Sequence, residues 1–559
     1  MIEFDEDKQK LKLAGLRERE EEDFVQSVAA KRGLQYIDLT HLPVNLEALQ
    51  LIPEAEAKAA YLGVFQLDKK KISVAALDPD EQKTKTALEA LTKRGFGITV
   101  FLVSHQSLNR LFSFYAQVIP EKETKTGSFD ISTEEITKIA KTVHTASDIK
   151  ASITEVIGKK TGFQTTSVVE VILAGALALK ASDIHMEPEE KQVRLRYRLD
   201  GVLNDILDFS YETYRYILSR IKLISGLKLN VQTVAQDGRF SIFVNEQEIE
   251  IRTSVLPGAY GESIVLRVLN PDAISVPMEE LGIEPNLYKI LEKELKRPNG
   301  MILTTGPTGS GKTTTLYAFL KKVYEPGVKV ITIEDPVEYH IRGIVQTQTD
   351  PEKGYTFSDG LRAALRQDPD IIMVGEIRDP ETAQTAVNAA STGHLVFSTL
   401  HTNNAAGTFP RFLGLGVNPK VISSSVTTAM AQRLARKLCT NCRKETVLDG
   451  EDKKLVEKVM NGIPISEYKD VPKEKAYTSV GCEKCNMTGY KGRVGLYEAI
   501  LMSSKIEQVI LQNPSEREIK LAAKDQGILT MLEDGVVKVL KGVTSMDEVR
   551  RVIDVDSEL

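Results

Sequence analysis

The stretch MILTTGPTGSGKTTTLYAFLKKVY, residues 301–324, constrains the fold of this chain more than any other feature. Four of its residues match G-x-x-x-x-G-K-[ST], the pattern of a phosphate-binding P-loop: Gly306, Gly311, Lys312 and Thr313. The apolar run MILTT before the motif predicts a buried strand, and LYAFLKKV after it has the i, i+3, i+4, i+7 spacing of a helix. A strand, a glycine-rich loop and a helix in this order indicate a nucleotide-binding α/β core.

The P-loop also predicts how a nucleotide is held. Loop amides and the positive end of the helix would meet the phosphates. Lys312 is expected to reach the β and γ phosphates, and the Thr313 hydroxyl to hold Mg²⁺. The remaining residues expected to bind the nucleotide are Pro307, Thr308, Gly309, Ser310 and Thr314. The chain has no N-K-x-D guanine motif, which favours ATP over GTP. The alternative is an incidental glycine turn, which would not account for the flanking strand and helix.

Three further apolar runs end in polar residues. VKVITIE ends in Glu334, DIIMVGE in Glu376, and LVFSTLH in His401. Ligands of open α/β sheets bind beyond the carboxyl ends of the strands, so we expect all three to converge on the phosphates. Either glutamate could activate the attacking water, and a structural ion pair is the alternative for each. Gly375 stands where many P-loop proteins carry an aspartate linked to Mg²⁺, so Glu376 would act alone or through a bridging water.

The run GHLVFSTLHTN carries two of the seven histidines of the chain, His394 and His401. His401 is well placed to sense a γ-phosphate, with a hydrogen-bonded structural histidine as the alternative. The two residues lie at opposite ends of a strand about 20 Å long, so they cannot share one task or bind one metal.

All four cysteines lie in C-x-x-C hooks, C-T-N-C at Cys439 and Cys442 and C-E-K-C at Cys482 and Cys485. Two such hooks form a tetrahedral Cys₄ site for Zn²⁺. A closed four-thiolate site leaves no open position, so the metal is expected to be structural. A redox pair is the alternative, but no βαβ pattern surrounds either hook.

The 559 residues can form several domains, and 42% hydrophobic with 27% charged residues is ordinary for a globular protein. The longest strongly apolar run, residues 168–179, is too short to span a bilayer, and the N-terminus lacks a secretory signal. A cytosolic chain is expected. The net charge of −6 makes nucleic-acid binding an unlikely role.

The pattern along the chain predicts several regions. A small α/β domain precedes a polar, mobile connection, in which a helix is expected around residues 133–144. Then come a helix and a mostly antiparallel sheet, a parallel sheet covered by helices, a cysteine-bearing insertion and an end that is helical from about Ser503. The expected boundaries are 1–117, 118–166, 167–272, 273–438, 439–490 and 491–559. Arg252 and Arg267, before the P-loop, could stabilise transition-state charge, or they could simply be solvated sheet residues.

These motifs resemble the ATPases of type II secretion and type IV pilus assembly. GPTGSGKT is similar to their Walker A box, ITIEDPVEY to the Asp box, DPDIIMVGEIRD to the Walker B box and GHLVFSTLHTN to the His box. The resemblance implies a multidomain α/β fold: a RecA-like core, preceded by a PAS-like α+β domain and a small N-terminal α/β domain. It also implies that Arg252 and Arg267, and more weakly Arg239, reach the nucleotide, and that the His box senses the phosphate state.

The resemblance further implies a homo-hexamer in which each second domain packs on a neighbouring core. The ring would drive a filament of pilin-like subunits, and its first domain would dock on an inner-membrane platform protein and an adaptor. The chain would then be cytoplasmic and peripherally attached to the membrane. Some relatives bind cyclic di-GMP through an Arg-Leu-Gly helix motif, but LKLAGLRERE, residues 11–20, departs from it, so this ligand is not expected.

Three other functions remain to be compared with a filament-assembly motor. A motor for DNA uptake shares the same motifs. A non-hydrolysing scaffold would have no need of the acidic residues. A pilus-retraction motor is disfavoured by the four cysteines, which that group lacks.

Overall fold

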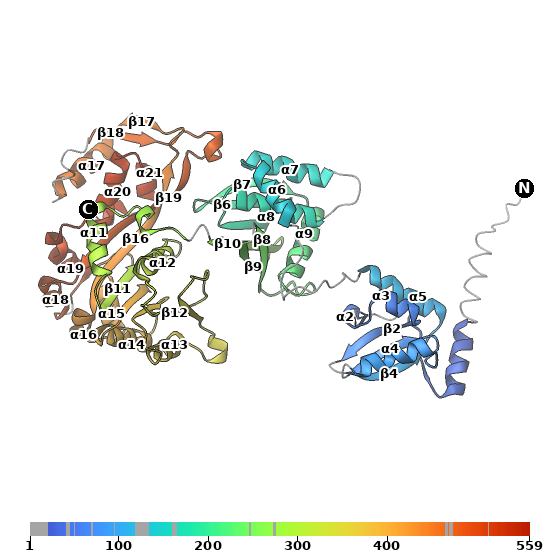
Figure 1. The fold of residues 1–559 in the computed structure, drawn as a ribbon. Helices are drawn as coiled ribbons and strands as arrows, with labels where there is room; N and C mark the ends of the chain where they lie inside the picture. The colour runs from blue at the N-terminus through green and yellow to red at the C-terminus, as the bar shows by residue number, and fades with distance from the viewer. Residues whose placement is uncertain are drawn as a thin grey trace, which may run out of the picture. The chain divides into compact units, whose positions relative to one another are not determined.

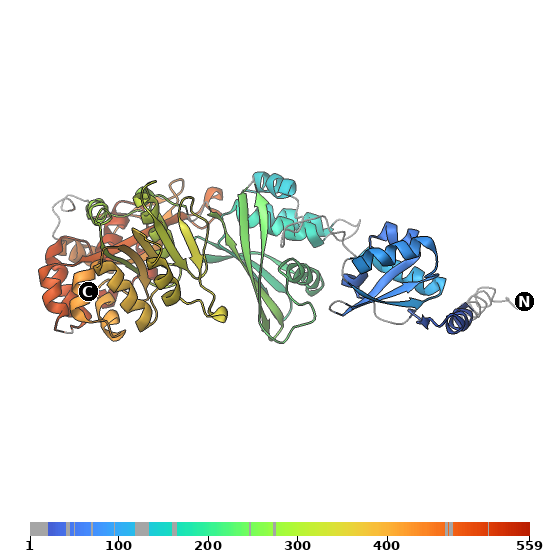
Figure 2. The same cartoon turned by 60° about the horizontal axis from the view of Figure 1, so that its bottom comes forward.

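The computed structural model describes most of the chain, in the ranges 21–40, 45–49, 51–68, 71–93, 96–117, 133–158, 165–244, 247–271, 275–463, 468, 473–512 and 514–558. It divides into two compact units, Met1–Thr124 and Lys125–Leu559, and each is described by itself (Figures 1 and 2). Within the described ranges, no helix is long and apolar enough to cross a membrane. The segment 11–20, which bears on cyclic di-GMP, lies outside these ranges.

The first unit is a small α/β fold, as the sequence predicts (blue in Figure 1). Its sheet has the order β1-β4-β3-β2, with β3 parallel to β4 and antiparallel to β2. Leu62, Val74 and Leu111 are buried in its core. The elements are β1 (Gln35–Tyr36), α2 (Leu46–Leu49), α3 (Glu54–Ala59), β2 (Leu62–Asp68), β3 (Lys71–Ala76), α4 (Gln82–Lys93), β4 (Gly97–Leu102) and α5 (His105–Ser113).

The second unit begins with two helices inside the segment 118–166, for which the sequence analysis expects a mobile connection. They are α6 (Thr133–Thr142) and α7 (Ala146–Gly158), and both pack against α8 (Thr165–Ala178). Ile136, Ile149 and Ile153 are fully buried there. The first is the helix expected around residues 133–144, whereas the second was not predicted, because its few apolar residues fall on one side of a helix in a polar segment.

The next layer is a six-stranded antiparallel sheet with the order β7-β6-β5-β10-β9-β8. The antiparallel pattern and the preceding helix are as predicted, and α9 (Tyr211–Ile224) is an additional helix. Alternate residues of β6 are buried, and the Tyr197 hydroxyl donates a hydrogen bond to the Ile172 carbonyl of α8 over 2.6 Å. The strands are β5 (Asp183–Pro188), β6 (Val193–Leu199), β7 (Val202–Phe209), β8 (Gln236–Val244), β9 (Gln247–Gly258) and β10 (Gly261–Leu269).

The P-loop belongs to a seven-stranded sheet with the order β13-β12-β14-β15-β11-β16-β19. Neighbouring strands are parallel except for β19, which is antiparallel to β16. The strands are β11 (Gly300–Thr305), β12 (Val330–Glu334), β13 (Val345–Gln348), β14 (Ile371–Val374), β15 (Leu395–Leu400), β16 (Val426–Leu438) and β19 (Tyr490–Leu501).

Helices complete this part of the molecule. The core is buried in two clusters, one of which contains Phe397 and Tyr317 and the other Val396 and Leu400. The helices that precede β16 are α11 (Pro285–Glu294), α12 (Lys312–Val323), α13 (Phe357–Leu365), α14 (Pro380–Ser391), α15 (Thr408–Gly414) and α16 (Pro419–Ser425).

The C-terminal region differs from its prediction at its start. Residues 491–501, which the expected boundary at 491 places in the C-terminal helical region, belong to strand β19, which is buried over most of its length, and the helices expected from about Ser503 begin at Ser504. A continuous apolar run buried on both faces has the same pattern in a strand and in a helix, so periodicity did not separate the two. The rest is helical, in α18 (Ser504–Ile510), α19 (Glu516–Ala523), α20 (Met531–Leu540), α21 (Met546–Val552) and α22 (Val555–Glu558).

Between β16 and β19 lies the cysteine-bearing insertion. It contains a two-stranded antiparallel sheet and one helix, α17, whose residues Leu455 and Val456 are buried against the main core. Its elements are β17 (Lys444–Val447), α17 (Gly450–Gly462) and β18 (Lys475–Thr478).

Candidate nucleotide and metal sites

The P-loop joins β11 to α12 through residues 306–311. Gly306 and Gly311 have φ angles of 146° and 91°, which side-chain-bearing residues rarely adopt. The Lys312 ammonium folds back on the loop and donates to the carbonyls of Gly306 at 2.8 Å and Pro307 at 3.2 Å. Burial lowers the pKa of Lys312, and the charge of Glu376 opposes that shift. A half-buried ammonium held only by carbonyls suits a phosphate group as its partner.

The structure brings Glu376 and His401 together beside the loop. The Glu376 carboxylate lies 3.2 Å from His401 Nε2 and 2.6 Å from the Arg378 guanidinium. The register explains the meeting, because Leu400 pairs with Thr305 and Ser398 pairs with Val374, so these strands end side by side. A cavity of about 920 Å³ is lined by residues 307–311 of the P-loop and by Lys312, Thr313, Thr314, Glu334, Glu376 and His401.

Glu334 lines the same cavity in a different environment. Its carboxylate is almost fully buried and accepts hydrogen bonds from three side chains: Tyr317, Thr332 at 2.5 Å and Gln346 at 3.1 Å. Burial raises its pKa, and the hydrogen bonds oppose that rise. The side chain of Glu376 is 13% exposed and carries charged partners, so it is the more accessible of the two carboxylates.

The two histidines are separated as their spacing predicts. His394 stands before β15, where its Nδ1 lies 3.0 Å from the Ala389 carbonyl, and it does not line the cavity. Its own carbonyl accepts a hydrogen bond from the Gly300 amide at the start of β11. His394 therefore connects the starts of β15 and β11, at the edge of the sheet away from the P-loop.

The arginines of the second unit's antiparallel sheet form a row across neighbouring strands. Cross-strand partners follow one another from Arg239 to Arg252, then to Arg267 and to Asp183. Arg267 lines the cavity and forms an ion pair with Asp183 at 3.1 Å. Arg252 instead contacts the residues just after β12, where it donates to the Val337 carbonyl at 3.3 Å. Arg239 is exposed on β8 and does not line the cavity.

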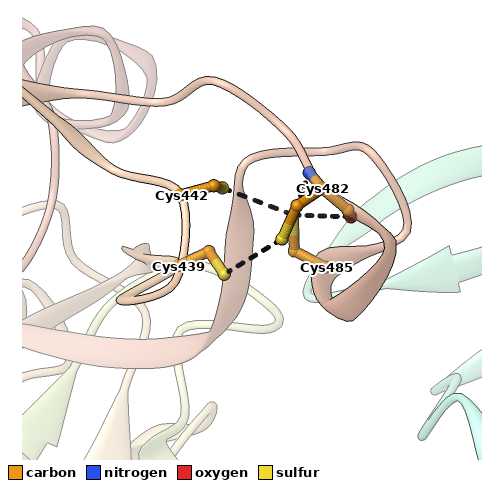
Figure 3. Close-up of side chains that lie close together, drawn as sticks. All are labelled: Cys439, Cys442, Cys482 and Cys485. Carbon is orange, nitrogen blue, oxygen red and sulfur yellow. Dashed lines mark hydrogen bonds between the residues drawn. The ribbon is translucent and has the colours of Figure 1, made fainter.

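The four cysteines form one cluster (Figure 3). Cys439 and Cys442 face Cys482 and Cys485, and all four sulfurs lie within 4.8 Å of one another. The separations from Cys482 to Cys439 and Cys485 are 3.9 and 3.7 Å. Four Zn–S bonds of about 2.3 Å place tetrahedral sulfurs about 3.8 Å apart, so the cluster fits zinc.

The thiols differ in their surroundings: burial raises the pKa of Cys442 to about 11, whereas the groups around Cys482 and Cys485 favour thiolates. Burial opposes ionisation of Cys482, but hydrogen bonds from Asn441 and the neighbouring thiols outweigh it and lower the pKa of Cys482 to about 7. The amides of Cys482 and Gly489 both donate to the Cys485 sulfur at 3.2 Å, an arrangement that stabilises a thiolate. The residues present can therefore hold a soft divalent metal.

Sequence reasoning missed several residues of the cavity. Arg433 and Leu434 line it near the end of the β11-paired stretch of β16, and Arg378, Arg493 and Arg551 also line it. The strand-end rule that selected Glu334, Glu376 and His401 also applies to Gln432 and Arg433, which follow the apolar stretch AMA. The arginines of β19 and α21 had no such signal, because only the folded sheet brings them near.

Comparisons with known proteins agree with this geometry. Residues 160–551 match the family model described as type II/IV secretion system protein. The chain is 42% identical to type II secretion system protein E of Dickeya dadantii, over 69% of this chain and 75% of that protein. It is 41% identical to type II secretion system ATPase E of Vibrio cholerae, over 69% of this chain and 74% of that protein.

Solved structures show the same fold. The chain is similar to the ATPase DotB of Legionella pneumophila, with a TM-score of 0.50, 21% identity and coverage of 71% of this chain and 98% of DotB. DotB of Yersinia pseudotuberculosis gives a TM-score of 0.51 at 19% identity, over 71% of this chain and 97% of that protein.

Proposed function

The chain belongs to the type II/IV secretion system protein family, and from this premise we propose that it is a hexameric motor that hydrolyses ATP to assemble a pilin-like filament. The filament would serve type IV pilus biogenesis or type II secretion. The observation that carries the proposal is the cavity in which the P-loop, Glu376 and His401 meet.

Within the cavity, each residue has a role that its contacts support. Lys312 leaves the Gly306 carbonyl and binds the β and γ phosphates of ATP, with the P-loop amides and the α12 N-terminus. Glu376, whose carboxylate is the accessible one, orients the attacking water and accepts its proton. His401, in contact with Glu376, senses the γ-phosphate. The Thr313 hydroxyl would hold Mg²⁺, which would neutralise phosphate charge when bound.

The arginine row contributes positive charge from the second unit's antiparallel sheet. Arg267 already lines the cavity, and Arg252 lies beside the loop after β12. Arg267 is 59% exposed, so its guanidinium is available to a phosphate as the two layers close, in one chain or across a ring. Arginine supplied in this way stabilises charge in the transition state of phosphoryl transfer.

The cysteine cluster completes the proposal as a structural zinc site. Cys439 follows β16 and Cys485 stands just before β19, so the metal would tie together the ends of two antiparallel strands of the core sheet. A site of four thiolates offers no position for a substrate, so it serves folding and leaves the chemistry to the cavity.

Hydrolysis is tested on the purified full-length chain. Phosphate release from Mg-ATP should be abolished by Lys312→Ala, and its rate per subunit should fall on dilution below the concentration at which hexamers are seen by light scattering. Glu457→Gln, an exposed glutamate of α17, is the control and should be unaffected. A rate per subunit that stays constant down to monomers would contradict a ring-dependent motor.

The filament is tested in cells. Surface filaments are counted by electron microscopy in cells that lack the gene, complemented with the natural chain or with Glu376→Gln. Filaments that return only with the natural chain would support an assembly motor driven by hydrolysis. Equal counts in all three strains would contradict pilus assembly and favour secretion or DNA uptake through a short pseudopilus.

A further inference from the structure

Three parallel strands end in a row around the P-loop. β11 lies between β15 and β16, with Thr305 level with Leu400 on one side and Ala431 on the other. The residues that follow are therefore neighbours: His401 after β15, Gly306 after β11, and Gln432 and Arg433 beside them on β16. The middle segment is the P-loop itself, so any contact between the outer two must pass over its first residue.

Gln432 and Arg433 make that contact. The Gln432 amide nitrogen donates to the Ser310 carbonyl of the P-loop at 2.7 Å. The Arg433 guanidinium donates from Nη1 to the Gln432 carbonyl at 3.1 Å and from Nη2 to the Asn403 carbonyl at 2.8 Å. Asn403 lies two residues after His401. The Arg433 guanidinium thus connects the loop after His401 to Gln432, whose side chain holds the P-loop.

The crossing explains why residue 306 has no side chain. A Cβ on Gly306 would lie 2.6 Å from the Gln432 carbonyl oxygen and 3.2 Å from Arg433 Nη1. Both separations are shorter than ordinary van der Waals contacts, so a side chain at residue 306 would clash with the backbone of β16 and with Ser310 Oγ, also at 2.6 Å, and would press on Arg433. Gly306 therefore provides room for the arginine as well as the φ angle of the P-loop.

The charge of Arg433 is also unusual. Among the described residues Arg433 forms no ion pair, whereas Arg436, three residues on, is paired with Glu548 at 2.6 Å. Burial lowers the pKa of Arg433, and the charges of Glu498 and Glu558 oppose that shift. Arg433 in turn helps lower the pKa of Lys312, after the larger effect of burial. Two cations that share a cavity favour an anion between them.

The loop of His401 is held from the other side as well. The Ala405 amide donates to the fully buried carboxylate of Glu498 at 2.7 Å, and the Thr402 amide donates to Thr305 Oγ1 at 2.8 Å. The Arg433 bond to the Asn403 carbonyl is a third anchor of the same short loop, between those of residues 402 and 405. Loss of that bond would therefore loosen the segment that follows His401.

We propose that Arg433 is a positioning residue that couples phosphate occupancy of the P-loop to the loop carrying His401. The inference rests on the proposed ATPase function and adds to it the contacts through which His401 responds to phosphate binding. When a triphosphate enters, the Arg433 guanidinium shifts toward it while still holding the Asn403 carbonyl, and His401 is set against the γ-phosphate and Glu376. Arg433 need not touch the reacting atoms.

Hydrogen exchange of the full-length chain, with and without a non-hydrolysable ATP analogue, measures this coupling. In the natural chain the analogue should slow exchange both in residues 304–315 and in residues 399–407. In Arg433→Gln the first segment should stay protected while the second loses most of its protection. The control, Arg550→Gln, removes an arginine whose partner is the surface residue Asp452 and should behave as the natural chain.

Kinetics distinguish positioning from simple nucleotide binding. Arg433→Gln should lower kcat at least about tenfold and change the KM for ATP by less than about threefold. The kcat of Arg433→Lys should lie between those of the natural chain and Arg433→Gln, because lysine lacks the planar guanidinium fork that spans the Gln432 and Asn403 carbonyls. It also keeps the positive charge, which makes it the variant to measure if Arg433→Gln fails to fold. In a chain that already carries His401→Gln, adding Arg433→Gln should cause little further loss of kcat, since both residues act through one route.

Other outcomes would overturn the inference. Full protection of residues 399–407 in Arg433→Gln would show that the loops are not coupled through Arg433, and a raised KM with unchanged kcat would assign it to nucleotide binding alone. If the natural chain itself shows no protection and releases no phosphate, the proposed function fails instead, so the two failures are separable.

Discussion

The nucleotide cavity and the cysteine cluster are assembled in opposite ways. The cavity collects side chains from strand ends that are far apart in the sequence, from Arg267 of β10 to Arg433 of β16. The cysteine cluster collects two hooks, each contained in four residues, and needs only that two strand ends meet. The first site depends on the register of a whole sheet, and the second depends on local spacing.

The two sites also differ in whether their charged or ligand groups have partners within the site. Among the residues that the structure describes, Lys312 and Arg433 of the cavity form no ion pair with a carboxylate, and Glu376 offers an accessible carboxylate beside them. The cysteine cluster points all four ligand atoms at one another. An arrangement with free charges is suited to binding and releasing a ligand, whereas a closed arrangement is suited to keeping one.

The largest effect is expected inside the cavity, where the two glutamates differ in environment. Glu376→Gln should lower kcat by about 10² to 10⁴, the usual contribution of a general base, with ATP affinity nearly unchanged. Glu334→Gln should act mainly on stability, by about 1–3 kcal/mol, because one acceptor becomes a donor that faces Tyr317, Thr332 and Gln346. Single-turnover kinetics and thermal unfolding of both variants measure the two effects.

The comparison of the two glutamates can also come out reversed. A loss of kcat in Glu334→Gln with an unchanged melting temperature would make Glu334 the base and would reduce Glu376 to a partner of Arg378 and His401. Glu457→Gln on the surface of α17 gives the background for both measurements.

The sequence predicted most of what depends on local pattern. The strand, loop and helix around Lys312 follow from the P-loop motif and the apolar spacing, and the clustering of the cysteines follows from two hooks. The strand-end rule placed Glu376 next to His401, because the ends of neighbouring parallel strands must meet. The roles of these residues stay predictions until they are measured.

What the sequence did not reveal depends on tertiary pairing. β19 is a strand because it pairs with β16, and its apolar run alone does not distinguish it from a helix. The helix expected around residues 133–144 is α6, but α7 is stabilised by burial of Ile149 and Ile153 against α8, which no local pattern in a polar segment announces. Arg433 enters the site because the register of β16 carries it past Gly306.

Loss of the metal should have a more confined effect than loss of the catalytic base. Cys482→Ser should abolish bound zinc, expected at one ion per chain by elemental analysis, and lower the melting temperature by several degrees. Faster hydrogen exchange should be restricted to residues 439–490 and the adjoining ends of β16 and β19, while ATP affinity is retained. Val480→Ser changes an exposed residue of the same loop and should retain the metal. A chain without zinc whose mass shows two disulfides would instead indicate redox pairing.

The smallest effect concerns Glu548 of α21, which lies where the two sites approach along β16. Its buried carboxylate is bonded to Arg436, three residues before the first cysteine, and to Arg551, which lines the cavity. Burial opposes ionisation, but the bonds from Arg551 and Arg436 outweigh it and lower the pKa of Glu548 to about 2. Because the folded value is below the unfolded one, this stabilisation is present above about pH 4.5 and is lost as pH falls toward 2.

The full shift would correspond to about 3 kcal/mol, and partial exposure of both arginines reduces it to about 1–2 kcal/mol. Glu548→Gln should therefore lower the free energy of unfolding at pH 7 by that amount and have little effect near pH 3, so the stabilities of the two proteins should converge on acidification. Urea unfolding at several pH values measures this difference. A constant difference between the natural chain and Glu548→Gln at every pH would assign the role of Glu548 to packing. The connection between the nucleotide cavity and the cysteine cluster along β16 would then depend on side-chain packing and not on ion pairs.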